Sequence, residues 1–536
     1  MAYRDLRHFI ETLEQKQELK RVTHPVSPYL EITEIADRIM KSNGPALLFE
    51  NVVGHAHRLG TPNPKSAIMG EPSIHPEADP AMQGGTSVTE ALRAAEGKET
   101  HASKAMPFKY PVAINLMGSR KRMSLALGVE DYEEHAQRLE HLVKPELPQG
   151  ALEALKKLPE LLGQLKNIPP KEVSKADCQE VVLRDKEVDL TRLPILTCWP
   201  EDGGPFITLP LVFTHDPETG KRNVGMYRMQ VYDAETCGMH WQMHKSGMRH
   251  MENAGAQGKK IEAAVALGGD PAYTFSAIAP LPPGIDEMLF AGFLRQENAR
   301  LVKCKTVDIK VPADAEFVLE GYVDPAERRL EGPFGDHTGY YSLAAEFPVF
   351  HVTCMTMRRN AIYPATIVGI PPMEDGWMGK AVERIFLPLI RLSVPEIVDI
   401  NLPVESCFHN VALVSIKKKF PGHAYKVMNA IWGLGGLAFT KLVFVFDEDC
   451  NVQDIGEALF RIGANCDPMR DTLHSRGPVD QLDHASVAEG FGGKLGFDCT
   501  HKWPGENGFS RDYPKLIRMA DDVKRRIDHI WGDLGL

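Results

Sequence analysis

The sequence lacks the features that would assign the protein to several broad classes. No apolar run approaches the roughly 20 residues of a membrane-spanning helix. Lys and Arg number 61 against 72 Asp and Glu, so no basic surplus is present to neutralise phosphates, and we expect no nucleic-acid partner. The start, MAYRDLRHFIETLEQ, has no continuous apolar core, and we expect no signal peptide there.

Paired cysteines and the common catalytic motifs are lacking as well. The nine cysteines are scattered, and no two of them form CxxC. Such a set indicates reduced thiols in the cytoplasm and argues against a cysteine zinc site. GxSxG, HExxH and EF-hand patterns are absent, and GFGGKLG near the C-terminus fits neither the dinucleotide nor the phosphate-loop pattern.

The composition that is present indicates a globular protein of several domains, with 536 residues of which 43% are hydrophobic and 25% charged. Residues 1–170 combine amphipathic helices with the buried strand ALLFENV, which predicts an α/β domain. An insertion at about 60–109, rich in Pro, Gly and small residues, favours a surface loop, with a lid or partner-binding segment as the alternative. A leucine-striped connecting helix is expected to end this domain.

Two further domains follow from the strand patterns. Residues 171–360 contain short β-rich runs such as ITLPLVFTHD and AEFVLEGYV, which predict a β-barrel or sandwich. Residues 361–536 place a helical segment between the apolar strands NVALVSIKKK and KLVFVFD, which predicts an α/β domain with a parallel sheet. The terminal segment LIRMADDVKRRIDHIWGDL predicts an amphipathic helix that packs on the subunit or its partner, with peripheral membrane contact as the alternative.

The stretch EGPFGDHTGYY contains two acids, Glu331 and Asp336, five residues apart. On a straight strand these side chains would point to opposite faces, but a turn at GPFG can bring them to one side. Two acids held close have pKa values that are pushed apart, so one of them can keep a proton and act as an acid. A solvated turn whose acids cap backbone amides is the alternative.

Two other motifs in the β-rich region carry polar side chains among apolar ones. In NVGMYRMQ, an inward Arg228 would need a carboxylate, and Glu331 is available; an arginine at the barrel surface is the alternative. In MHWQMHKSG, His240 and His244 would lie about 13 Å apart along a strand, too far for one metal. A single histidine beside oxygen ligands suits manganese or magnesium, and polar residues at a barrel rim are the alternative.

Taken together, these motifs resemble the UbiD family of prenylated-flavin-dependent decarboxylases of aromatic and α,β-unsaturated acids. The resemblance is nearly full-length and rests on LEITEIADRI, PILTCWPEDGGPFIT, NVGMYRMQ, EGPFGDHTGYY, IKKKFPGHAYKVM and KLGFDCTHKWPGE. It implies an N-terminal α/β domain, a central split β-barrel that binds the flavin, and a C-terminal α/β domain through which subunits form dimers or hexamers.

The resemblance also implies roles for single residues. The expected catalytic residues are Glu331, Arg228 and Asp336, with Asp336 as the proton donor. Asn223, Glu287 and His244 are the expected ligands of Mn²⁺ or Mg²⁺, an ion that would hold the cofactor phosphate, and a monovalent cation such as K⁺ is a further expectation. The residues expected to line the cofactor are Met226, Tyr227, Arg228, His240, Trp241, Gln242, His244, Lys245 and Ser246.

The implied function is the reversible, non-oxidative decarboxylation of 4-hydroxy-3-polyprenylbenzoate or a related hydroxybenzoate, as in ubiquinone biosynthesis. Prenylated FMN would serve as the electron sink for this chemistry, and a flavin prenyltransferase would supply it. Arg228 is expected to keep Glu331 ionised and leave Asp336 protonated. The alternatives are a flavin-dependent oxidoreductase on a split barrel and a non-enzymatic flavin- or metal-binding protein. A cytoplasmic location is expected, with peripheral contact at the inner membrane face as an option.

Overall fold

The computed structural model describes residues 2–54, 106–143, 168–243, 245–281 and 285–535. The predicted leucine-striped helix and most of the insertion at about 60–109 lie outside these residues. The chain forms two compact units. Unit 1 comprises Met1–Ser393, Leu402–Asn410 and Pro478–Gly492, and unit 2 comprises Val394–Asn401, Val411–Gly477 and Gly493–Leu536.

Unit 1 begins with the α/β arrangement that the sequence predicts. The apolar stripe of α1 (Leu6–Gln15) is buried, and Asp5 caps this helix by accepting a hydrogen bond from the backbone N of His8 at 2.9 Å. A four-stranded sheet has the order β1 (Leu19–Val22), β2 (Ala46–Phe49), β5 (Val112–Ile114) and β20 (Tyr363–Pro364). Because β20 follows the central β region in sequence, the chain returns to its N-terminal sheet after that region.

The helices of unit 1 are divided between the N-terminal sheet and the central β region, where α7 (Ser246–Ala256) packs against β16 (Phe317–Glu331). Besides α1, the α-helices of unit 1 among the described residues are α2 (Glu31–Lys41), α4 (Arg120–Ala126), α5 (Glu133–Val143), α7 (Ser246–Ala256), α8 (Pro271–Ser276), α9 (Glu287–Arg295) and α10 (Glu374–Ser393). Near the start of α10, Glu374 accepts a hydrogen bond from the backbone N of Met117 at 2.6 Å, which ties this helix to the segment after β5.

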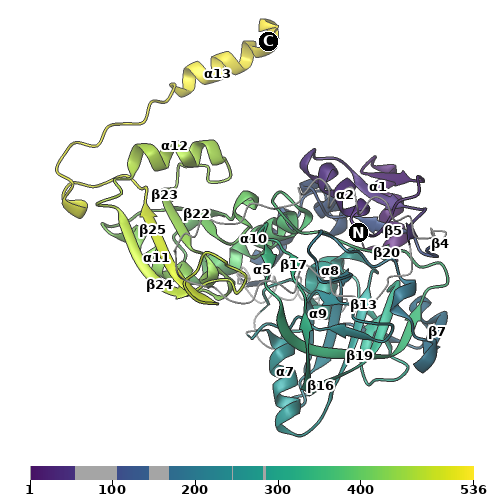
Figure 1. Ribbon diagram of the computed structural model, residues 1–536. Helices are drawn as coiled ribbons and strands as arrows, with labels where there is room; N and C mark the ends of the chain where they lie inside the picture. Colours follow the sequence, from purple (N-terminus) through teal and green to yellow (C-terminus); the bar gives the residue numbers. More distant parts are fainter. Residues whose placement is uncertain (1, 55–105, 144–167, 244, 282–284, 536) are drawn as a thin grey trace, which may run out of the picture. The chain divides into compact units, whose positions relative to one another are not determined.

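The central β region is an antiparallel sheet with the order β10 (Arg222–Met226), β9 (Leu211–His215), β13 (Ile261–Leu267), β16 (Phe317–Glu331), β19 (Ala345–Met357) and β12 (Thr236–Gly238). Its strands β13, β16 and β19 are labelled in Figure 1. β7 (Val181–Arg184) pairs with β19 as well. Within the described residues β10 and β12 remain edge strands, so this sheet is open in its hydrogen bonding and does not by itself display the expected split β-barrel.

The two longest strands, β16 and β19, are bent where their register shifts. One shift falls between Glu320 and Gly321, and another between Val323 and Arg328. A Cβ atom at Gly321 would lie 1.8 Å from the carbonyl oxygen of His351, so the first bulge requires glycine. Glu331 is the last residue of β16. It lies beyond both register shifts and directly before the turn that follows the strand.

Smaller strands complete unit 1. They are β3 (Val53–Gly54), β4 (Met106–Pro107), β6 (Lys171–Val173), β8 (Phe206–Ile207), β11 (Met229–Gln230), β14 (Arg300–Lys303), β15 (Lys310–Pro312), β17 (Phe334–Gly335) and β18 (Tyr341–Ser342). β11 pairs with β8 and β17 pairs with β18. These two short pairs flank the residues of the candidate site.

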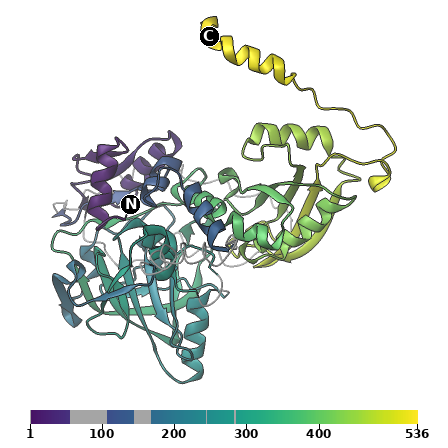
Figure 2. The same cartoon turned by 180° about the vertical axis from the view of Figure 1, so that it is seen from behind.

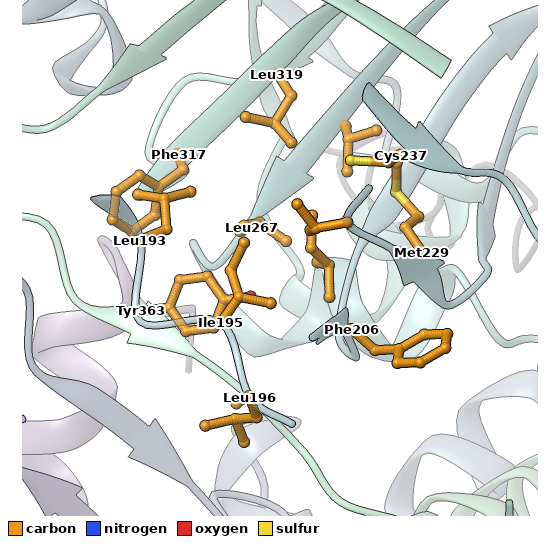
Figure 3. Packing of buried hydrophobic residues seen from close by; sticks show 14 of the residues in the cluster. Leu193, Ile195, Leu196, Phe206, Met229, Cys237, Leu267, Phe317, Leu319 and Tyr363 are labelled. Carbon is orange, nitrogen blue, oxygen red and sulfur yellow. The ribbon is translucent and has the colours of Figure 1, made fainter. Parts of the chain in front are cut away.

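A shared hydrophobic core joins the N-terminal and central parts of unit 1. Phe206 and Met229 from the short strands pack in one cluster with Phe317 and Leu319 of β16 and Tyr363 of β20 (Figure 3). All five side chains are buried. The core therefore fixes β11, which directly follows Arg228, to both sheets.

Unit 2 contains a mixed α/β sheet. Its central strands are parallel, as the sequence predicts, whereas the edge strand Ile397–Asn401 pairs antiparallel with its neighbour. The strand order is β21 (Ile397–Asn401), β22 (Val411–Ile416), β23 (Leu442–Asp447), β25 (Phe491–Asp498) and β24 (Thr472–Pro478). Figure 1 labels four of these strands, and Figure 2 shows the same sheet from behind. β22, β23 and β25 are parallel. The helix α11 (His423–Trp432) connects β22 to β23, and α12 (Ile455–Asn465) follows β23.

The predicted terminal helix is present but shorter than the sequence suggests. α13 spans Asp521–Ile530, and a 3₁₀ turn (Trp531–Leu534) follows it. No residue of α13 is buried, and Ile517, before the helix, is 98% exposed. In the part of the chain that the structure describes, no helix is both long and apolar enough to cross a bilayer.

Candidate active site

Hydrogen bonds join the turn after β16 to the PEDGG segment, residues 200–204. Asp202 accepts a hydrogen bond from the backbone N of Gly335 at 2.8 Å, and the backbone N of Gly203 donates to the carbonyl of Pro333 at 2.7 Å. A Cβ on Gly332 would lie 2.5 Å from the Cα of Gly203, so the two segments meet only because both residues are glycine. Burial raises the pKa of Asp202 to about 6, despite these hydrogen bonds.

This turn places both predicted acids in the protein interior. Glu331 is 1% exposed and Asp336 is 6% exposed. The solvated turn considered as the alternative is therefore not the observed structure. Two buried carboxylates so near each other require positive charge or hydrogen-bond donors.

Arg228 supplies that charge to both acids. Its Nε and Nη2 donate to Glu331 Oε1 at 3.0 and 2.8 Å, and its Nη1 forms a short ion pair with Asp336 Oδ2. Nη2 also donates to Ser342 Oγ at 2.9 Å, and the guanidinium lies 4.9 Å from the ring centroid of Phe334. The three residues expected to act together are thus in direct contact.

The protonation state of Asp336 differs from the expectation. Burial raises the pKa of Asp336, but attraction to Arg228 and hydrogen bonds from His337 outweigh burial and hold it well below its usual range. Arg228 contacts both carboxylates and not Glu331 alone, which the sequence could not show. Asp336 is therefore ionised in this structure.

A second partner of Asp336 is His337, a residue for which the motifs predict no role. The backbone N and the Nδ1 atom of His337 lie 2.7 and 2.9 Å from Asp336 Oδ1, and its Nε2 lies 2.9 Å from His409 Nε2. Burial lowers the pKa of His337, but the adjoining carboxylates, foremost Asp336, raise it to about 9. Asp480 also lies close to this pair. One carboxylate oxygen of Asp480 and one ring nitrogen of each histidine, His337 and His409, all lie within 4.8 Å of one another.

His240 stands on the other side of the acids, against Glu331. Its Nδ1 lies 2.9 Å from Glu331 Oε1, and its ring packs on Phe347 with centroids 4.2 Å apart. Burial lowers the pKa of His240, so the ring is neutral near pH 7 and its Nδ1–H donates to the carboxylate. Gln242 Nε2 lies 3.5 Å from His240 Nε2 and orients the ring from the opposite edge.

A second region contains the expected metal ligands that the structure describes. Asn223 of β10 and Glu287, the first residue of α9, both line a cavity of about 310 Å³. Glu287 Oε2 accepts a hydrogen bond from the backbone N of Val224 at 3.0 Å, and burial raises the pKa of Glu287 to about 7. His244 lies outside the described residues.

The surroundings of this cavity fit a hard cation and a phosphate. The Nδ2 atom of Asn223 is buried and has no hydrogen-bond partner among the described residues, so it can donate to a phosphate oxygen, while a cation would have to bind the amide oxygen Oδ1. Ser246 lines the cavity at the first turn of α7, where backbone N–H groups favour an anion. The basic residues lining it are Lys221, Arg222 and Arg249.

The remaining residues expected to line the cofactor lie in the hydrophobic core of unit 1 or at the N-terminus of α7. Tyr227 and Trp241 belong to the hydrophobic core, and Trp241 is completely buried against Gly247 of α7. Met226 packs against two core clusters, and Lys245 is the N-cap residue of α7. Trp241 thus supports the N-terminus of α7 by packing, and contact of these side chains with a cofactor stays a prediction.

Three family models match most of the chain. Residues 10–62 match the N-terminal domain of 3-octaprenyl-4-hydroxybenzoate carboxy-lyase, residues 171–371 its Rift-related domain, and residues 376–499 its C-terminal domain. An uncharacterized protein of Archaeoglobus fulgidus is 47% identical over 536 residues, which cover 100% of this chain and 99% of that protein.

Solved structures share the fold over almost the whole length. Vanillic acid decarboxylase of Sedimentibacter hydroxybenzoicus in its closed form is 25% identical, with a TM-score of 0.77 and coverage of 100% of this chain and 99% of the other. An evolved dimeric form of the UbiD-class enzyme HmfF from Pelotomaculum thermopropionicum, in complex with prFMN, is 27% identical, with a TM-score of 0.70 and coverage of 94% and 98%. The chain therefore belongs to the UbiD family and is a carboxy-lyase of that family.

Proposed function

We propose that the protein catalyses the reversible, non-oxidative decarboxylation of a hydroxybenzoate, with prenylated FMN and a divalent metal. The observation that carries this proposal is the buried set at the end of β16, where Arg228 bridges Glu331 and Asp336. The similarity to vanillic acid decarboxylase supports an aromatic acid as substrate, and the similarity to HmfF with prFMN supports the cofactor. 4-Hydroxy-3-polyprenylbenzoate, as a step of ubiquinone biosynthesis, is the narrower form of the proposal.

The side chains of the site divide the chemical work. When bound, prenylated FMN would supply the electron sink that decarboxylation at an aryl carbon needs, since ordinary side chains cannot delocalise that electron pair. Asp336 delivers the proton that replaces CO₂ on the carbon. Glu331 lies beside Asp336 and is held in a fixed orientation by three hydrogen bonds to its Oε1 atom, two from Arg228 and one from His240.

The cofactor phosphate and its metal would lie in the cavity between β10 and α9. Asn223 and Glu287, with His244, would ligate Mn²⁺ or Mg²⁺ through a donor set rich in oxygen, which these ions prefer. The N-terminus of α7 and the basic lining would offset the phosphate charge. The proposal includes a K⁺ ion beside this site. It also includes a split β-barrel around the flavin, of which the open central sheet would form one wall.

The proposal extends to partners and location. The exposed apolar residues before and within α13 support its use as a contact between subunits of a homo-oligomer, a dimer or a hexamer. A flavin prenyltransferase would supply the cofactor. A cytoplasmic location is part of the proposal and agrees with the nine free cysteines, and peripheral contact with the inner membrane face is the alternative use of α13.

The test is to produce the protein together with a flavin prenyltransferase and to measure CO₂ release from a panel of hydroxybenzoates. We expect turnover that falls by about 100-fold or more in Asp336→Asn and Glu331→Gln. Glu327→Gln, at a surface carboxylate that is 45% exposed, is the matched control and should leave turnover unchanged. Oxidation of a nicotinamide donor with plain FMN, independent of Asp336, would instead indicate an oxidoreductase.

A further inference from the structure

We propose that His337 stores the proton that Asp336 delivers to the substrate carbon, and that His409 holds His337 in position for this transfer. The inference rests on the proposed function, because it names the source of the proton for that reaction. His337 is a positioning residue in this scheme, since it acts on the substrate only through Asp336.

The contact between His337 and Asp336 is suited to proton transfer. Asp336 uses its two oxygens differently: Oδ2 meets Arg228, whereas Oδ1 accepts from the backbone N and faces the Nδ1 atom of His337 at 2.9 Å. The backbone hydrogen bond fixes the imidazole relative to the carboxylate. A proton that moves from Nδ1 to Oδ1 therefore travels along a hydrogen bond that already exists.

The opposite edge of the imidazole is held by a second histidine. The two Nε2 atoms of His337 and His409 lie 2.9 Å apart, so one of them must donate and the other must accept. A doubly protonated His337 donates through both ring nitrogens at once, to Asp336 and to His409. The ring of Phe408, with its centroid 5.7 Å from that of His337, covers one side of this arrangement.

The charges around the ring favour its protonated form. The charged and titratable groups near His337 are Asp336 on its own turn, Arg228, His409, Asp375 of α10 and Asp480. Three of these are carboxyl groups, and only Arg228 carries a fixed positive charge. In agreement, the pKa of His337 is raised to about 9 although burial acts against it, while Asp336 is held ionised. At neutral pH the proton of this pair therefore resides on the imidazole.

In the decarboxylation direction the proton moves in two steps, from His337 to Asp336 and from Asp336 to the substrate carbon. The Nδ1–H bond of His337 breaks as an O–H bond forms on Asp336 Oδ1. That O–H bond then breaks as a C–H bond forms at the ring carbon that lost CO₂. His337 is left neutral and regains one proton from water, so each CO₂ released consumes one solvent proton, and no oxidant or reductant takes part.

The first test reads the proton on His337 without any turnover. In the full-length protein with ¹³C-labelled histidine, the NMR signal of His337 is the one among 20 histidines that is lost in His337→Gln. We expect this signal to titrate near pH 9, and its midpoint to fall by more than one pH unit in Asp336→Asn. The matched control is His351→Gln, which removes a surface histidine that pairs with Glu327 at 2.6 Å and should leave the signal unchanged.

The second test measures decarboxylation by the cofactor-loaded enzyme over pH. We expect His337→Gln to lower kcat by about 10–100-fold at pH 7, to change KM by less than about twofold, and to move the alkaline limit of kcat to lower pH. His409→Phe should produce the same shift in weaker form. His351→Gln should retain the wild-type profile.

The outcomes separate this inference from the proposed function. A His337 signal that titrates at or below pH 7 overturns the inference, whether or not the protein is active. So does a His337→Gln enzyme whose kcat falls by one factor at every pH, because that is the result of a purely structural role. If the loaded wild type releases no CO₂ from any acid tested, the proposed function fails, and the NMR titration still reports on His337.

Discussion

Arg228 donates two hydrogen bonds to a single oxygen of Glu331, from Nε at 3.0 Å and from Nη2 at 2.8 Å. The other oxygen of Glu331, Oε2, is buried and has no partner among the described residues. The guanidinium thereby keeps Nη1 for Asp336 and bridges two acids. Such a fork matches the planar geometry of arginine and not that of lysine.

Replacing Arg228 with lysine should therefore disrupt the site although the charge is kept. One ammonium group has three N–H donors on a single nitrogen and cannot reproduce the four hydrogen bonds of Arg228, and breaking a buried pair costs about 3–5 kcal/mol in the free energy of unfolding. We expect a loss of that order in urea unfolding and a fall in decarboxylation of at least about 100-fold. Arg329→Lys is the control, because its pair with Asp233 is about half exposed and should change stability by less than about 1 kcal/mol. Equal effects of the two substitutions would contradict the assignment.

The ion pair of Asp336 and His337 predicts a pH dependence of stability. The folded-state pKa of His337 is raised to about 9, so its contribution is complete below its unfolded value near 6.5 and disappears as the pH rises through about 9. The pKa of Asp336 is lowered, so its contribution is present above its unfolded value near 3.9 and disappears in stronger acid. The stabilisation should be largest between about pH 4 and 6.5.

The measurement is the free energy of unfolding of wild type and His337→Gln in urea from pH 5 to pH 10. The difference between them should be on the order of 3 kcal/mol at pH 6 and should shrink toward zero at pH 10. His351→Gln, the surface control, should give a small difference with no such slope. A difference for His337→Gln that stays constant over this range would disprove the pairing.

The regular elements were predictable because their patterns are local. The spacing of Leu6, Phe9 and Ile10 fixes the buried face of α1, and the apolar run of β22 marks a strand of a parallel sheet. The return of the chain from the central β region to the N-terminal sheet was harder to predict from the sequence. β20 crosses back to the N-terminal sheet through Tyr363, and no local pattern encodes the partner of a two-residue strand.

The site was predictable only as far as single motifs reach. Glu331 and Asp336 are five residues apart, and the turn between them is readable from glycine and proline. Their protonation depends on Arg228, more than 100 residues away, and on His337, whose own partner His409 is 72 residues away. Sequence spacing cannot measure such contacts, which is why Asp336 was expected to be the protonated acid. A histidine directly after the acid was the one available signal for His337.

Metal binding gives a third prediction, at Glu287. Replacing this carboxylate with an amide keeps the shape of the side chain and removes the charge that a divalent ion needs. We expect Glu287→Gln to bind Mn²⁺ at least about tenfold more weakly, measured by electron paramagnetic resonance of free Mn²⁺. Glu297→Gln, at an exposed carboxylate just after α9, is the control and should bind as wild type does. Unchanged binding by Glu287→Gln would move the metal away from the cavity.

The last prediction concerns the C-terminal segment, whose apolar side chains contact nothing in their own chain that buries them. The residues Met519, Val523, Ile527, Trp531 and Leu534 recur at helical spacing and are 37–61% exposed. If they form a subunit contact, deleting residues 519–536 should lower the mass in light scattering while urea unfolding of the subunit changes by less than about 0.5 kcal/mol. Val523→Ser with Ile527→Ser should act like the deletion, and Lys524→Ser with Asp528→Ser on the polar face should not. An unchanged mass together with loss of flotation on anionic liposomes would assign the segment to a membrane surface instead.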